Sequence, residues 1–384
     1  MKDLIVFGKP SIDKNDINEV AKVLKSGWIG NGPKTKEFEK YFKKHVGSKY
    51  AIAVNSCTSA LSLSLKLLSI GRGDEVITTP ITFASTANVI VHEGAIPVFA
   101  DIDKETGNIS PEEIKNKITS KTKAIIMVHF AGRPCEIEKI MNIARAKRIE
   151  VIEDCAHAVE AKYKKMSCGN FGVAGCFSFY PTKNITAGGG GMIVTNDKKM
   201  ADRTKILSSY GINKSARKRF ENKVNFYEVI ECGYNYQMND ILAALGLSQL
   251  KKIKKNLKTR KEIWNQYLNG LADLEEISLP PKTPKDIIHA CHLFTTLLNL
   301  EKLKISRNKF ISILRNKGIC TGIHFLALHK QPAFRKIIGE NIYLPNAEYF
   351  SERVVSLPLD ANLTSEQIEY IIKTIRKTIK RYSK

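Results

Sequence analysis

The sequence contains no apolar run long enough to cross a membrane. A membrane-spanning helix needs about 18 to 20 consecutive apolar residues, whereas the longest apolar runs, such as Ala124–Val128, have the length of a strand. The N-terminal segment includes charged side chains and lacks the long apolar region of a secretory signal. We therefore expect a soluble cytoplasmic protein that has no membrane partner.

Cysteine is also scarce, with eight residues among 384 and no Cys-x-x-Cys pair. This content is too low for a disulfide-stabilised secreted scaffold, so we expect reduced thiols, several of them packed in the core. The tightest group of possible metal ligands is His289, Cys291 and His292. The chain offers no second ligand pair at the spacing of a zinc site, and we expect no metal.

Acidic residues are few relative to basic ones, 38 against 61, which gives a formal net charge of +23. A basic surface can bind nucleic acid, an acidic membrane or anionic metabolites. The excess is densest at Lys251–Lys261 and Lys373–Lys384, where apolar residues recur at helical spacing. The sequence has neither zinc-finger spacing nor an aromatic RNA-binding motif. We therefore expect no nucleic-acid partner, although the charge would help to attract a substrate that carries a diphosphate.

Strand-like and helical patterns alternate through the first three-fifths of the chain. The apolar runs typical of strands are 75–79, 96–101, 124–129, 151–154, 176–180 and 192–195. Helical periodicity covers 13–26, 58–68, 85–92, 111–118 and 136–147. This alternation predicts an α/β fold with a mostly parallel sheet covered on both faces. Val151–Asp154 ends in acidic residues, at the end of a strand where such sheets bind their ligands.

The pattern changes near residue 250. Lys251–Leu271 has the periodicity of a long basic helix, and a proline-rich break follows at Leu279–Pro281. The rest of the chain shows one strand-like run and two helical patterns, at 292–298, 307–317 and 364–379. We therefore predict a large α/β domain over residues 13–250 and a smaller C-terminal domain over residues 251–384, which residues 1–12 would join.

Three segments carry residue types that could serve one site. Lys183 follows a short strand and precedes the glycine run Gly188–Gly191; alone it could be a surface lysine before a turn. Asp154, 29 residues upstream, could cap a helix or could pair with a cationic ring nitrogen. Asn55–Leu61 opens a helix and could be an ordinary cap or an anion site built from hydroxyl and N–H groups.

Pyridoxal phosphate (PLP) requires all three features: a lysine for covalent attachment, an aspartate at the pyridinium nitrogen and a site for a phosphate. A dinucleotide-binding oxidoreductase would instead carry Gly-x-Gly-x-x-Gly after its first strand, and the sequence lacks that motif there. The residues therefore favour a PLP enzyme over a nicotinamide enzyme.

The chain resembles the DegT/DnrJ/EryC1/StrS family of PLP-dependent sugar aminotransferases over nearly its whole length. The matching motifs are Ser26–Pro33, Gly73–Pro80, Gly94–Val98, Val151–His157, Phe177–Lys183, Gly233–Met238, Ala243–Leu250 and Ser356–Leu359. Within the family it is most similar to the enzyme that makes UDP-4-amino-4-deoxy-L-arabinose. That similarity rests on residues 121–126, 128–132, 183–186, 321–325 and 344–348.

The resemblance implies PLP-dependent transferase fold type I, the fold of aspartate aminotransferase. Its large domain would hold a mostly parallel seven-stranded sheet, and its smaller C-terminal domain would be α+β. Lys183 would bind pyridoxal 5'-phosphate covalently and later move a proton, while Asp154 would pair with the pyridine nitrogen. His157 would lie near the oxygen on the cofactor ring, and Phe83 would stack on the ring itself.

The resemblance also implies a phosphate site and a shared dimer. Thr58, Ser59 and Ser178 would bind the cofactor phosphate. Asn235 would reach the phosphate of the neighbouring subunit's cofactor, so that a homodimer would share its active sites. The alternative interpretation of Asn235 is a cap for a helix that begins near Met238.

Three positions depart from the family's usual pattern. Gly189 stands where the family often has glutamate, Gln237 replaces an arginine, and Cys57 stands where glycine or alanine is frequent. None of these changes removes a catalytic atom. The first two could alter contacts with the substrate or the geometry of a loop.

The reaction that the resemblance implies is transfer of an amino group from L-glutamate to the C4 keto carbon of a UDP- or dTDP-linked keto-sugar, for amino-sugar and surface-polysaccharide synthesis. The alternatives are amination of a C3 ketone or of a cyclitol, or a non-catalytic basic binding or regulatory protein on the same fold. The complete Asp154 and Lys183 pair argues against a non-catalytic protein. A family dehydratase would carry histidine in place of Lys183, which argues against dehydration.

Overall fold

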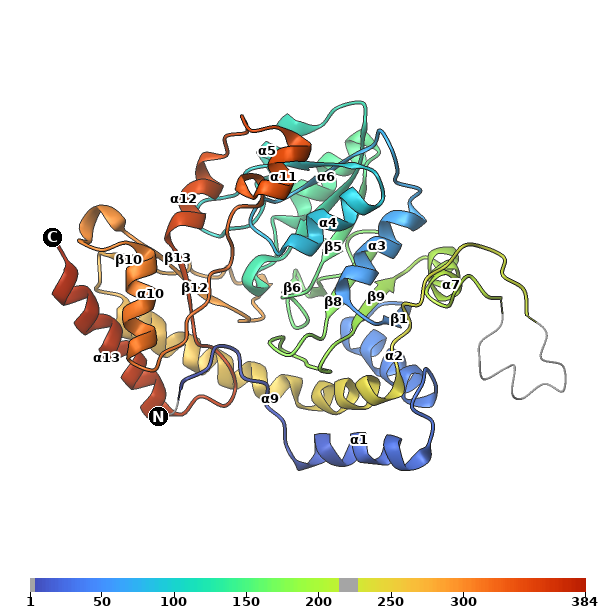
Figure 1. Cartoon of the computed structure of the whole chain (residues 1–384), viewed down its shortest axis with the longest axis horizontal. Coiled ribbons are helices and arrows are strands. Elements are labelled where there is room, and N and C mark those ends of the chain that lie inside the picture. Colours follow the sequence, from blue (N-terminus) through green and yellow to red (C-terminus); the bar gives the residue numbers. More distant parts are fainter. Residues whose placement is uncertain (1–3, 214–226) are drawn as a thin grey trace.

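The computed structural model describes residues 4–213 and 227–384. It is built around a seven-stranded sheet, whose place among the helices is seen in Figure 1. In chain order the strands are β1 (Tyr50–Val54), β2 (Glu75–Thr78), β3 (Ile96–Phe99), β4 (Thr122–Val128), β5 (Glu150–Asp154), β8 (Ala174–Ser178) and β9 (Gly191–Thr195). Their order across the sheet is β1-β9-β8-β5-β4-β2-β3. Only β9 runs antiparallel to its neighbours within this sheet, which agrees with the predicted mostly parallel arrangement.

Helices cover both faces of this sheet because successive strand residues point to opposite sides. In β4, Ile125 and Met127 face one core and Ala124 and Ile126 face the other. The first core is covered by α2 (Pro33–Val46), α5 (Pro111–Lys117), α6 (Ile137–Lys147) and the first part of α9 (Asp240–Leu271). The second is covered by α3 (Cys57–Leu67), α4 (Ala84–His92) and α7 (Lys198–Leu207).

A second, antiparallel sheet lies in the C-terminal part of the chain. It consists of β10 (Ile277–Ser278), β12 (Phe294–Leu298) and β13 (Val354–Leu357). Its core includes residues from α10 (Arg307–Asn316) and α13 (Ser365–Tyr382). The remaining α-helices and strands in the described part of the chain are α1 (Lys14–Ser26), β6 (Lys162–Tyr163), β7 (Met166–Ser167), β11 (Ile287–Ile288), α11 (Pro332–Ile338) and α12 (Pro345–Arg353). Three short 3-10 helices cover Phe130–Gly132, Leu300–Lys302 and Leu328–Lys330.

The long helix α9 connects the two sheets and their cores (Figure 1). Its first part packs beside α1 and α2, and its last turns contact α13. The helix is continuous from Asp240 to Leu271, so the predicted domain boundary at residue 250 falls inside it. The division into two domains at that residue therefore stays a prediction. Among the described residues, no helix combines the length and apolar character that a bilayer crossing requires.

Candidate active site

The carboxyl ends of three strands meet at one edge of the large sheet. Gly191 pairs with Val54 of β1 on one side and with Ser178 of β8 on the other. On the far side of β8, Asp154 at the end of β5 pairs with Cys176. The sheet register therefore places the start of α3, Ser178 and Asp154 next to one another, as expected for a ligand site in such a sheet.

The first turn of α3 supplies hydroxyl groups and free backbone donors at this edge. Ser56 is the N-cap, and its Oγ accepts a hydrogen bond from the N–H of Ser59 at 3.0 Å. The Ser59 Oγ lies 2.6 Å from Asn55 Oδ1, and the side chain of Thr58 is exposed. The remaining N–H groups of a first turn have no partner within the helix, so this end can bind an anion. Ser56 thus acts as the ordinary cap that the sequence allowed. Ser59 uses both its N–H and its hydroxyl as donors within this turn, whereas the exposed hydroxyl of Thr58 stays available.

Asp154 is buried and is held by two hydrogen bonds. Its Oδ1 accepts from the N–H of Ala156 at 3.1 Å, and its Oδ2 accepts from the hydroxyl of Thr86 on α4 at 2.9 Å. Burial raises the pKa of Asp154, whereas these hydrogen bonds and the charge of Lys183 lower it. The residues after Asp154 form turns rather than a helix, so the alternative that Asp154 is a helix cap is wrong.

Lys183 lies in the turn that follows β8, and its N–H donates to the carbonyl of Tyr180 at 2.9 Å. Burial lowers the pKa of Lys183 to about 8, while the nearby carboxylate of Asp154 and the thiol of Cys57 act in the opposite direction. The lowered pKa makes the unprotonated, nucleophilic form of this amine more populated near neutral pH than it is for an exposed lysine. The structure thus brings the predicted lysine and the predicted aspartate into electrostatic contact.

Two rings lie close to these groups. His157 is buried, its ring stacks on Phe325 at a centroid distance of 5.9 Å, and its Nδ1 has no hydrogen-bond partner. Burial, followed by the charge of Lys183, holds the pKa of His157 well below its usual range, so the ring is neutral. Phe83 precedes α4, is 64% exposed and lies 6.4 Å from Phe325 between ring centroids. An exposed aromatic ring and an unpaired buried nitrogen are both features that a bound ring would satisfy.

Asn235 lies beside the start of α3 with an exposed side chain. Its backbone carbonyl accepts from Asn55 Nδ2 at 3.2 Å. The cap of α9 is Asn239, whose side chain accepts from the N–H of Leu242 at 3.0 Å. The alternative that Asn235 caps this helix is therefore wrong, because the helix begins further along the chain than the sequence suggested.

All three departures from the family pattern lie in the described part of the structure, and Gln237 pairs with Val54 in an isolated antiparallel bridge. Gly189 has no positive φ, and a Cβ there would meet only Leu242 at 4.0 Å, so the backbone does not require glycine. Gly191 differs, because a Cβ there would approach the backbone of Ser56 within 2.5 Å. Cys57 lies 3.6 Å from the carbonyl of Cys176, and burial raises the pKa of its thiol well above the usual value.

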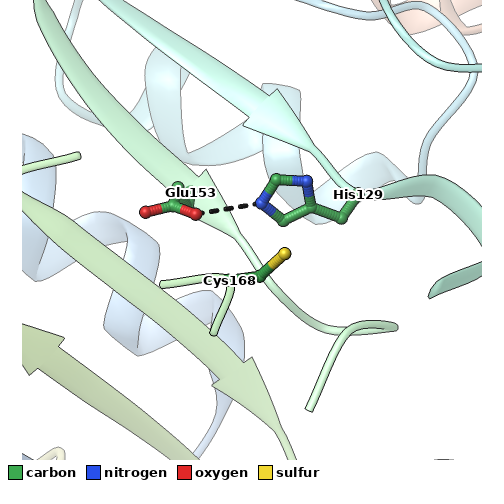
Figure 2. A group of neighbouring side chains, drawn as sticks. All are labelled: His129, Glu153 and Cys168. Carbon is green, nitrogen blue, oxygen red and sulfur yellow. Dashed lines mark hydrogen bonds and ion pairs between the residues drawn. The ribbon is translucent and has the colours of Figure 1, made fainter. Parts of the chain in front are cut away.

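A buried cluster of His129, Glu153 and Cys168, in which Glu153 directly precedes Asp154, has the composition of a metal site (Figure 2). The carboxylate of Glu153 already accepts four hydrogen bonds. Glu153 Oε2 accepts from His129 Nε2 at 3.0 Å and from the N–H of Gly169 at 2.7 Å. The other oxygen accepts from two backbone N–H groups of the loop after β7, those of Phe171 and Gly172. The cluster therefore serves to fasten this loop to β5.

Sequence reasoning missed several side chains at this site. One is Thr86, whose hydroxyl donates a hydrogen bond to Asp154. The others lie in or beside the turn that carries Lys183, and they are Asn184, His292 and His324. His292 was considered only as a metal ligand, together with His289 and Cys291. In the structure, His292 Nδ1 bonds Asn184 Oδ1 at 2.9 Å, and His289 Nδ1 accepts from the N–H of Cys291 at 2.8 Å. The one signal in the sequence that could have pointed to these missed residues is that Asn184 directly follows the predicted lysine.

The residues at this edge fit PLP by their chemistry. The start of α3 with Ser178 provides for a phosphate, Asp154 for a ring nitrogen and Lys183 for a covalent bond. His157 Nδ1 supplies an unused hydrogen-bonding atom beside them.

Comparisons with known proteins give the same assignment. A model of the DegT/DnrJ/EryC1/StrS aminotransferase family matches residues 10–376. The spore coat polysaccharide biosynthesis protein SpsC of Bacillus subtilis is 41% identical over 377 residues, which cover 97% of each chain. Helicobacter pylori PseC, an aminotransferase involved in the biosynthesis of pseudoaminic acid, superposes with a TM-score of 0.92 at 30% identity, covering 99% of this chain and 100% of its own.

The Streptococcus pneumoniae protein Spr1654 has been solved in a PLP form, which superposes with a TM-score of 0.92 at 31% identity and covers 98% of this chain and 99% of its own. Its PMP form gives a TM-score of 0.93. Together these matches confirm the predicted fold type I, the predicted class of PLP-dependent sugar aminotransferase and the predicted cofactor.

Proposed function

Because the chain belongs to the DegT/DnrJ/EryC1/StrS aminotransferase family, we propose that it transfers an amino group from L-glutamate to the C4 keto carbon of a UDP- or dTDP-linked keto-sugar. The product would enter the synthesis of amino sugars and surface polysaccharides. The observation that carries the proposal is Lys183, a lysine whose pKa burial lowers to about 8, beside the buried carboxylate of Asp154. The net charge of +23 supports an anionic substrate such as a nucleotide sugar.

Bound PLP would supply an electron sink for the carbanion that forms when the amino acid loses its α-proton. Lys183 Nζ would hold the cofactor and then, once free, would take up the proton and deliver it again as a general base and acid. A pKa of about 8 suits both directions, because the protonated and neutral forms are both populated near neutral pH. Asp154 would keep the ring nitrogen protonated through a charged hydrogen bond.

The other predicted residues would bind and orient. Thr58 and Ser59, with the N–H groups of the first turn of α3, would hold the phosphate together with Ser178. Phe83 would cover one face of the ring, which accounts for its exposure of 64%. His157 would offer its unpartnered Nδ1 to the oxygen on the ring. We also propose a cytosolic location, which the free thiols of all eight cysteines support.

We propose in addition that the working unit is a homodimer with shared sites. The support is the exposed side chain of Asn235 beside the phosphate-binding turn, where it has no capping role. Mixing Lys183→Ala chains with Asn235→Ala chains would give heterodimers in which one site combines an intact Lys183 with Asn235 of the partner subunit. Activity should then appear, with up to one working site per heterodimer.

A control for this mixture adds Ser178→Phe to the Asn235→Ala chain, which blocks the phosphate site and should prevent any recovery. Native mass spectrometry would show that the heterodimer has formed. If Asn235 acts within its own chain, the first mixture will show only the residual activity of the Asn235→Ala homodimers, and the shared site would be refuted.

The substrate proposal is tested by incubating the PLP-loaded protein with L-glutamate and a panel of UDP- and dTDP-4-keto sugars. Mass spectrometry should detect an amino sugar and 2-oxoglutarate with at least one 4-keto sugar, and Lys183→Ala should give neither. Amination of a 3-keto sugar or a keto-cyclitol, with none of the 4-keto sugars converted, would contradict the proposed position of the ketone.

A further inference from the structure

A cavity separate from the proposed PLP site lies between the C-terminal half of α9 and the proline-rich segment that follows β10. Its volume is about 470 Å³, which is within the range of ligand-binding cavities in proteins. Its walls are mainly apolar, and the side chains that form them are Trp264, Leu268, Pro280, Pro281, Pro284 and Ile287. None of the described residues that line it has been assigned to PLP.

The proline-rich wall of this cavity is held in place by hydrogen bonds to its backbone. Arg133 donates from Nη1 to the carbonyl of Pro281 at 3.0 Å and from Nη2 to that of Lys282 at 3.3 Å. The N–H of Ile287 donates to the carbonyl of Pro284 at 3.1 Å, and β11 pairs with β6. Because the proline rings also fix the backbone φ angle, the cavity is formed before any ligand binds.

His289 lines the cavity with a ring that is only 7% exposed. Burial, followed by the charges of Arg133 and Lys261, lowers the pKa of His289 to about 3, so the ring is neutral. Its Nδ1 accepts a hydrogen bond from the N–H of Cys291 at 2.8 Å, and a neutral ring that accepts at Nδ1 carries its proton on Nε2. This Nε2–H has no hydrogen-bond partner among the described residues, and it is not sealed from solvent.

Trp264 on α9 offers a second donor of the same kind. Its indole is 8% exposed and lies 4.7 Å from the ring of His289 between centroids. Within the described ranges its Nε1–H also has no acceptor, although the atom is not sealed from solvent. Because both rings line the cavity, two N–H groups of nearly buried side chains are open to a ligand inside it. Such donors are usually paired, and a ligand with acceptor atoms would pair both.

The charges around the cavity select the kind of acceptor. Lys261, Lys282 and Lys285 line it, and none of them forms an ion pair with another described residue. The described residues that form the lining include no carboxylate. Three uncompensated ammonium groups attract an anion and disfavour a cation, and a charged acceptor forms stronger hydrogen bonds with N–H donors than a neutral one does.

We propose that this cavity binds a small organic anion, in which a carboxylate, sulfonate or phosphate group is carried on an apolar body. The oxyanion accepts hydrogen bonds from His289 Nε2 and Trp264 Nε1 and is neutralised by the surrounding lysines. The apolar body packs against Leu268 and the prolines of the opposite wall. This site is additional to the proposed aminotransferase reaction and does not depend on it.

The test compares the anionic probe 8-anilinonaphthalene-1-sulfonate with N-phenyl-1-naphthylamine, which has the same rings and no sulfonate. The chain has two tryptophans, so PLP-loaded protein labelled with ¹⁵N-tryptophan gives two indole N–H signals, which Trp264→Phe assigns. The sulfonate should shift the Trp264 signal in a saturable manner and leave that of Trp28 unchanged, and the neutral probe should bind at least about tenfold more weakly. A Trp264 signal that neither probe shifts, or that both shift with equal affinity, would overturn the proposal.

Replacing His289 by asparagine tests the buried donor. The amide oxygen of asparagine can still accept from the N–H of Cys291, but nothing donates at the position of Nε2. Loss of a hydrogen bond to a charged group should weaken binding of the sulfonate probe roughly 10- to 100-fold. Circular dichroism and the melting temperature would establish that the variant is folded, and unaltered affinity in the folded variant would overturn the proposal.

A second variant leaves the buried side chains intact. Lys261→Gln with Lys285→Gln removes two exposed charges from the rim and should weaken binding of the sulfonate roughly 2- to 30-fold, with a smaller effect at high salt. The matched control, Lys40→Gln with Lys44→Gln on α2, removes the same charge away from the cavity and should leave the affinity unchanged. Equal affinities in the two double variants would contradict the anion site. No sugar or amino donor is used, so a failed substrate screen leaves this test unaffected.

Discussion

Replacing Glu153 by glutamine tests whether the buried cluster of Figure 2 is a structural fastening. The change preserves the shape of the side chain and removes its charge. In the native protein each carboxylate oxygen accepts two hydrogen bonds: Oε2 from His129 Nε2 and the N–H of Gly169, and Oε1 from the N–H groups of Phe171 and Gly172. The amide nitrogen of glutamine cannot accept, so one of these two pairs of donors loses its acceptor in either orientation.

The expected loss of stability in Glu153→Gln follows from the number of hydrogen bonds that lose their acceptor. A hydrogen bond to a charged group contributes about 1.5 to 3 kcal/mol, so two lost bonds cost about 3 to 6 kcal/mol. A neutral amide is less costly to bury than a carboxylate, which offsets part of the loss. We therefore expect Glu153→Gln to lower the free energy of unfolding by about 3 kcal/mol.

Urea unfolding of the apo-protein, followed by circular dichroism, measures this difference directly. The control is Glu138→Gln on α6, an exposed carboxylate bonded to Lys164 and Tyr163, which should leave the midpoint unchanged. A loss of less than about 1 kcal/mol in Glu153→Gln would refute the count of hydrogen bonds on which the prediction depends.

Three further predictions concern the site and its support. Asp154→Asn should lower kcat by at least about tenfold with a smaller change in KM for the amino donor, and near-normal turnover would contradict the role of the carboxylate. Asp240→Ala should destabilise the protein by about 3 kcal/mol in urea unfolding, because the buried carboxylate accepts from the N–H groups of Gly32 and Thr35 and from the Thr35 hydroxyl; a loss under about 1 kcal/mol would contradict this. Between pH 8 and 10.5 the unfolded chain binds one more proton at Lys183 than the folded apo-protein, so stability should rise with pH across this window. Lys183→Met should remove that rise, and an unaltered pH dependence would count against the lowered pKa.

The parts of the fold that the sequence predicted are those with a strong local pattern. Six of the seven strands of the large sheet were predicted from short apolar runs, whereas β1 (Tyr50–Val54) was missed. Helix α1 has an apolar period, an aspartate cap and a final Gly27. The sequence analysis missed α2 although Phe38, Phe42 and Val46 recur at a spacing of four, because lysines surround them. It also predicted a helix beginning near Met238 and a helical pattern over Lys251–Leu271 without joining them into one helix, since the Asp240–Leu250 segment is apolar on most sides and lacks a clear polar face.

The candidate site likewise contains residues that the sequence could predict and contacts that it could not. Lys183 and Asp154 could be predicted because Asp154 ends one strand, Lys183 lies in the turn after another, and both belong to recognisable motifs; the sheet topology then brings these strand ends together. The contacts of His292 with Asn184 and of Glu153 with His129 could not, because their partners are 108 and 24 residues apart and no periodicity links them. Only the tertiary fold creates these pairs.

The central claim is that Lys183 is the residue that binds PLP covalently. The direct measurement is to incubate the purified protein with PLP, reduce it with sodium borohydride, digest it and locate the added mass by mass spectrometry. We predict one modified peptide, which contains Lys183, together with loss of the yellow absorption band and no stable label in Lys183→Ala. Modification of any other peptide in place of the one with Lys183 would contradict the account.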